Sequence, residues 1–67
     1  MMIKELKQLQ VTMEQMERLI RALEDLKETV LPSNPELFAA MAEGPLEDLG
    51  RLREEVNGFV HELKTTA

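Results

Sequence analysis

Residues 2–31 contain neither glycine nor proline, and apolar side chains recur through them at alternating spacings of four and three residues. Eight of nine positions in this first series are apolar: Met2, Leu6, Leu9, Met13, Met16, Ile20, Leu23, Lys27 and Val30. Such spacing puts every member on one side of an α-helix, as in a coiled coil. Most other residues here are good helix formers with unbranched stems. The sequence therefore predicts a long amphipathic helix over about residues 2–31.

The segment that follows predicts a helix end and a new helix start. Pro32 has no N–H group and disfavours the helical conformation in the residue before it. Two N-caps compete for the next helix, because Ser33 with Glu36 fits a capping box, whereas Asn34 precedes a proline in the first helical position. We favour Asn34, since a residue before proline prefers the extended conformation of an N-cap. A short helix is expected over about residues 35–43.

The dipeptide Gly44–Pro45 predicts a second break, because Pro45 cannot donate a hydrogen bond to the carbonyl of Met41. A third helix is expected over about residues 45–64. Its apolar residues also fall at three- and four-residue spacing: Leu49, Leu52, Val56, Phe59 and Leu63. Asn57–Gly58 is a candidate for an earlier cap of this helix, and the sequence leaves that alternative open.

These lengths predict the fold, because the second and third helices together nearly match the first. We expect an all-α protein, with residues 1–67 forming a single small helical domain. Its architecture is an antiparallel helical hairpin. The long first helix packs against a broken second arm, made of the short helix and the third helix, and hairpins assemble into an oligomeric helical bundle.

Composition excludes several classes of function. The chain has 8 basic and 13 acidic residues, a net charge of −5, no cysteine and only two aromatic side chains. An acidic surface disfavours nucleic acid and anionic lipid, and the absence of cysteine excludes disulfides and thiolate metal sites. The longest apolar run, residues 37–42, is far shorter than the roughly 20 residues of a membrane span. With no signal-peptide pattern at the start, we expect a cytoplasmic protein that binds neither nucleic acid nor membrane.

Chemistry-bearing residues are sparse. His61 is the only histidine, and Gly58 stands where a Glu-x-x-His metal motif would need its glutamate. Ser33 is the only serine, and it lies in a cap-like turn. No glycine-rich phosphate loop is present. We therefore expect no enzymatic activity, no catalytic residue, no cofactor and no metal.

A second apolar series beside the first predicts self-association. It comprises Met16, Leu19, Leu23, Leu26 and Val30. One series can face the third helix of the same chain, and the other then needs a neighbour. Below about 70–80 residues a single core rarely supplies more than 3–5 kcal/mol, and oligomerisation is a common remedy. We expect a homodimer or higher homo-oligomer with these five residues at its interface.

Function is expected to be non-enzymatic, as a helical module for protein–protein interaction or oligomerisation. The alternative is an acidic regulatory partner, antitoxin-like or chaperone-like, that masks a basic protein surface. The stretch from Glu36 to Asp48 holds several acids and no base, which favours a basic protein partner in that alternative.

Overall fold

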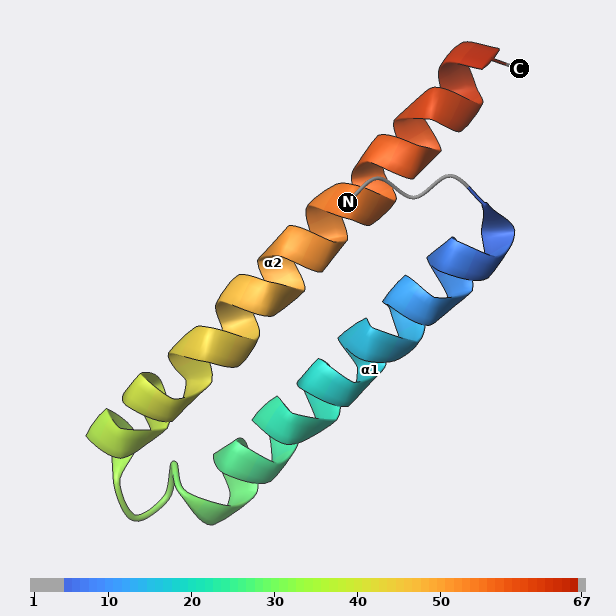
Figure 1. The fold of residues 1–67 in the computed structure, drawn as a ribbon. Helices are drawn as coiled ribbons and strands as arrows, with labels where there is room; N and C mark the ends of the chain where they lie inside the picture. Colours follow the sequence, from blue (N-terminus) through green and yellow to red (C-terminus); the bar gives the residue numbers. More distant parts are fainter. Residues whose placement is uncertain (1–4, 67) are drawn as a thin grey trace.

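The chain forms two antiparallel α-helices joined by a short turn (Figure 1). The computed structural model describes the backbone of residues 5–66. Helix α1 spans Leu6–Thr29 and helix α2 spans Pro35–Thr66. The principal extents are 50 × 17 × 16 Å, so the molecule is a rod two helices thick. The expected all-α, antiparallel hairpin is confirmed.

Helix α1 begins at Leu6, after Glu5 adopts an extended conformation with φ −136° and ψ 155°. The part of the predicted helix that falls on residues 2–4 lies outside the described residues. At the other end, the helix stops at Thr29, whose hydroxyl donates to the carbonyl of Asp25 at 2.7 Å. The N–H groups of Val30 and Leu31 both donate to the carbonyl of Leu26, at 2.9 and 3.1 Å, and close the last turn.

The turn between the helices supplies partners for its own backbone. The carbonyl of Val30 accepts hydrogen bonds from the N–H groups of Asn34 and Ser33, at 2.8 and 3.2 Å. Asn34 Oδ1 accepts from the N–H of Leu37 at 3.0 Å, which confirms Asn34 as the N-cap of α2. The hydroxyl of Ser33 instead points back to the Val30 carbonyl, at 3.4 Å.

The predicted break at Gly44–Pro45 is wrong. Helix α2 is continuous, with Pro45 inside it, and it also runs past Asn57–Gly58. The reason lies in the side chains that face α1, which keep one alternating spacing straight through the proline: Phe38, Ala42, Pro45, Leu49, Leu52, Val56 and Phe59. A continuous helix keeps all of them on one side, whereas a break would turn part of the row away. This packing outweighs the hydrogen bond that Pro45 cannot donate.

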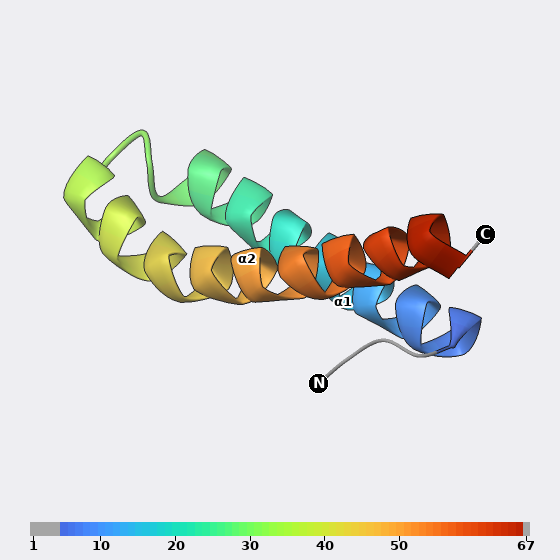
Figure 2. The same ribbon diagram turned by 90° about the horizontal axis from the view of Figure 1, so that it is seen from above.

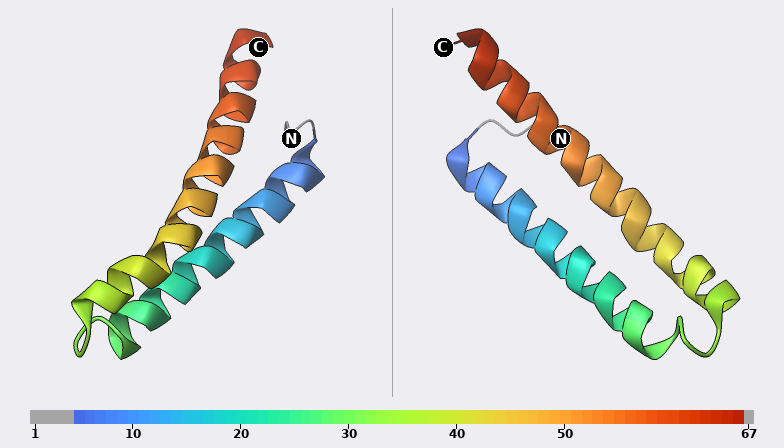
Figure 3. Two further views of the ribbon diagram at one scale, coloured as in Figure 1. Left: turned by 60° about the vertical axis from the view of Figure 1, so that its left-hand side comes forward. Right: turned by 180° about the vertical axis from the view of Figure 1, so that it is seen from behind.

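The seam between the helices is a row of half-buried side chains with three buried members. Ala42 is 2% exposed, Leu52 4% and Thr12 7%. On α1 the apolar and small residues of the row alternate at three and four residues: Leu9, Thr12, Met16, Leu19, Leu23 and Leu26. The two helices pack against each other. They cross at an angle, so that α1 passes behind α2 in Figure 2, and in the left view of Figure 3 they diverge towards the free ends.

Candidate interaction surface

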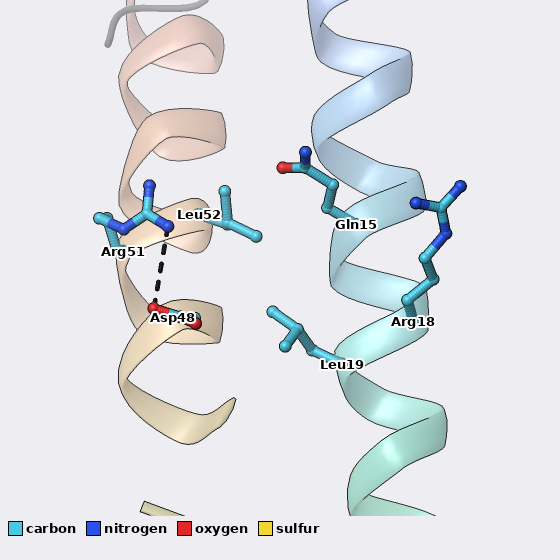
Figure 4. Close-up of a pocket in the computed structure, with 6 residues that line it drawn as sticks. All are labelled: Gln15, Arg18, Leu19, Asp48, Arg51 and Leu52. Carbon is cyan, nitrogen blue, oxygen red and sulfur yellow. Dashed lines mark ion pairs between the residues drawn. The ribbon is translucent and has the colours of Figure 1, made fainter. Parts of the chain in front are cut away.

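The five residues predicted for an interface between chains are all half-buried within the single chain. Leu19 points across the seam towards Leu52 of α2 (Figure 4). Met16, Leu23 and Leu26 continue the same seven-residue pattern along α1, and Val30 follows directly after it. The structure thus brings these residues together as the hairpin's own seam. Their contact with a second chain stays a prediction.

Several large apolar side chains remain exposed. On α1, the residues Leu6, Met13 and Ile20 recur every seven residues and are 76%, 49% and 43% exposed. They belong to the first apolar series, beside the seam. On α2, Leu46 and Val60 are 54% and 41% exposed and lie fourteen residues apart. Seven-residue spacing keeps each set on one side of its helix.

On the other side of the seam from these exposed apolar residues, the hairpin carries a groove of about 350 Å³ (Figure 4). Six residues line it: Gln15, Arg18, Leu19, Asp48, Arg51 and Leu52. Arg51 Nη2 lies 3.8 Å from Asp48 Oδ1, and Arg51 Nη1 lies 4.0 Å from Glu55 Oε1. The Arg51 and Asp48 side chains are 63% and 59% exposed, so their pair adds little stability.

The exposed apolar rows lie on the face opposite this groove. Met13 stands two residues from Gln15, and Ile20 stands two residues from Arg18. Two residues along a helix correspond to about 200° of rotation, which places the members of each pair on opposite sides. Leu46 is related to Asp48 in the same way.

We call this surface the apolar face. It consists of Leu6, Met13 and Ile20 from α1 and of Ala39, Leu46 and Val60 from α2. Each row is completed at seven-residue spacing by one base, Lys27 on α1 and Arg53 on α2. The hairpin therefore has one largely apolar face and an opposite face that combines the groove with the exposed apolar side chains of Val11, Leu37 and Met41.

Among the described residues, neither the groove nor the apolar face places a nucleophile beside a base. The groove holds two guanidinium groups, one carboxylate and one amide. His61 is exposed on α2. Over the described residues, no three His, Cys, Asp or Glu side chains are grouped to hold a metal ion. Neither α1 nor α2, over the part of the chain that is described, is long and apolar enough to cross a membrane.

Two residues in the sequence indicate which side of α1 faces α2, and the prediction made from the sequence uses neither of them. Thr12 occupies a seam position, which a search for apolar residues passes over. The second is Lys27, which belongs to the first apolar series. Because a lysine is seldom buried without a partner, its presence indicates that the first series does not face α2. The seam series instead continues through Thr12, a small residue that packs between helices.

Comparison with protein-family models, with curated proteins and with solved structures gives no match in any of the three.

Proposed function

We propose that this hairpin is a non-enzymatic helix-association module that forms a homo-oligomeric helical bundle through its apolar face. The observation that carries the proposal is the row Leu6, Met13 and Ile20, which stays exposed after α1 has packed on α2. A helix in a two-stranded pair needs two apolar positions in every seven. A third apolar position is typical of helices that face more than one neighbour in a bundle.

The exposed area supports the same conclusion. The chain of 7.7 kDa exposes 5381 Å². A globular monomer of this mass exposes roughly 4,300 Å², so the hairpin has an excess of roughly 1,000 Å². A stable protein–protein interface covers about 800 Å² on each partner. A contact through the apolar face would cover part of this excess.

The small interior is a further support. Among the described hydrophobic residues, only Ala42 and Leu52 are buried within the single chain. The sequence has no cysteine to add a disulfide. Association would therefore supply the apolar burial that a chain of this length lacks alone.

An acidic regulator of a basic protein is the second candidate. It is supported by four exposed carboxylates near the start of α2, on Glu36, Glu43, Glu47 and Asp48. The apolar face contains bases at Lys27 and Arg53, so that surface favours self-association over a basic partner. Binding to a basic protein would instead use the carboxylates and weaken steeply with salt.

Sedimentation equilibrium and light scattering from micromolar to submillimolar concentration test the proposal. We expect a mass of at least two chains and a melting temperature that rises with concentration. A mass of one chain throughout would refute self-association.

Met13 and Val11 provide a matched pair of variants, since both are 49% exposed and lie on opposite sides of α1. Met13→Glu should weaken association at least tenfold, because it puts a charge into the apolar face. Val11→Glu carries the same charge change away from that face and should have little effect. Equal effects of the two variants would show that the apolar face is not the contact surface.

A further inference from the structure

Two bases interrupt the apolar face, one in each row. Lys27 follows Ile20 by seven residues, and Arg53 lies midway between Leu46 and Val60. Within residues 5–66 the ion pairs belong to Arg51, and neither Lys27 nor Arg53 takes part in one. A partner that covered this face with apolar groups alone would leave both charges without compensation, which is costly. The partner therefore needs acids at two defined positions.

The hairpin itself carries acids at the outer rim of the same face. Glu17 lies two residues before Leu19, and Glu43 lies two residues before Pro45. Leu19 and Pro45 are half-buried in the seam, so a rotation of about 200° directs each glutamate away from the other helix of its own chain. Neither acid can therefore reach across the seam to a base on the other helix of the same hairpin.

Measured along the long axis of the rod, Arg53 lies at a height close to that of Glu17, and Lys27 lies at a height close to that of Glu43. The groove sets Gln15, Arg18 and Leu19 beside Asp48, Arg51 and Leu52 of the antiparallel helix. Arg53 follows directly after this group and lies at the height of its Gln15 end, close to the height of Glu17. Lys27 lies about two helical turns beyond Leu19, and Glu43 lies about one and a half turns before Asp48, so both are displaced from this group towards the connecting turn.

We infer that a second copy of the chain docks face to face on the apolar face, related by a two-fold axis parallel to the helices. Helix α1 of each copy then covers α2 of the other in antiparallel orientation. This places Arg53 against Glu17 of the partner subunit, and Lys27 against Glu43 of the partner subunit. The two-fold axis repeats both contacts, so four charge pairs flank one apolar layer. The inference rests on the proposed function, because it specifies how self-association occurs.

The matched heights of base and acid favour this arrangement over the other face-to-face dimer. A two-fold axis perpendicular to the helices would stack α1 on α1 and α2 on α2. The two rows that contain Arg53 would then face each other, as would the two rows that contain Lys27. Only the first arrangement leaves every residue at its own height along the rod, so it alone fixes both base–acid contacts without a choice of register between the copies.

Charge reversal at one pair tests the arrangement. Glu17→Arg leaves two arginines at each contact, and Arg53→Glu leaves two glutamates. Each variant alone should weaken dimerisation about tenfold, because two equivalent attractive pairs become repulsive. An equimolar mixture of the two variants should form a heterodimer with wild-type affinity to within about twofold, since every contact then pairs Arg with Glu. The double variant should likewise dimerise as the wild type does.

Arg18→Glu is the matched control for Arg53→Glu, because it lowers the net charge by the same amount but lies on the groove. Circular dichroism checks that every variant stays helical, and sedimentation equilibrium gives the dissociation constants. If the wild type dimerises but the two single variants behave like Arg18→Glu, or if mixing them restores nothing, the arrangement is overturned and self-association stands. A wild-type mass of one chain would overturn self-association itself.

Discussion

Two proline-containing segments of this chain have opposite effects on the helix. At Pro32–Pro35 one helix ends and the next begins, whereas at Gly44–Pro45 helix α2 continues unbroken. In the turn, the Val30 carbonyl and the Asn34 side chain take over the hydrogen bonds that the helix ends leave open. Beside Pro45, Gly44 has no side chain with which to cap a new helix.

The difference shows that a proline ends a helix where the chain also supplies replacement partners and a change of direction. The row of side chains facing α1 runs in phase through Pro45, so continuing the helix keeps Phe38 and Ala42 on the seam together with Leu49. Pro35, in contrast, occupies the first helical position, where no N–H is required. Packing against α1 by the residues before and after a proline thus decides whether the helix continues through it.

The largest expected effect comes from placing a proline in α1, where no such adaptation exists. Ala22 is exposed in the middle of that helix. Ala22→Pro should lower the free energy of unfolding by about 3 kcal/mol or more, because it removes a backbone hydrogen bond and clashes with the preceding turn. Urea unfolding followed by circular dichroism measures the loss. Ala22→Ser is the control, and a similar loss in both variants would contradict this comparison of prolines.

Removing the tolerated proline should have a smaller effect of opposite sign. Pro45→Ala restores an N–H that can donate to the Met41 carbonyl, and alanine is about 3 kcal/mol more favourable inside a helix. The gain is reduced because the unfolded chain also becomes more flexible. A net stabilisation of about 2 kcal/mol is expected in thermal and urea unfolding. Pro35→Ala should change little, and a loss of stability in Pro45→Ala would mean that the proline ring contributes essential packing.

The smallest expected effect concerns the cap of α2. Asn34→Ala removes the 3.0 Å hydrogen bond from the N–H of Leu37 and should cost about 1 kcal/mol. Asn34→Asp keeps an acceptor at the same place and should retain most of the stability. Both values follow from urea unfolding at pH 7. If Asn34→Ala is neutral, the turn is held by the backbone bonds of Val30 and not by the side-chain cap.

The sequence predicted features that depend on local chemistry better than those that depend on two helices at once. Asn34 as a cap follows from its own preferences and those of Pro35. The continuity of α2 does not, because Gly44–Pro45 disfavours a helix locally and is overruled by packing against α1. Either of two apolar series on α1 could have faced α2. The burial of Thr12 and the exposure of Lys27 show which of the two does so. Only the pairing of both helices fixes that choice.

The short turn also has a consequence for how the hairpin forms. Closing a connection of a few residues costs little chain entropy, so the two helices can meet first beside the turn and then pair progressively towards their free ends. The last side chains to pair lie near Leu6 and Leu63, which remain 76% and 52% exposed. We therefore expect the hairpin to close from the turn outwards, and we expect thermal opening to begin at the free ends and to proceed towards Asn34.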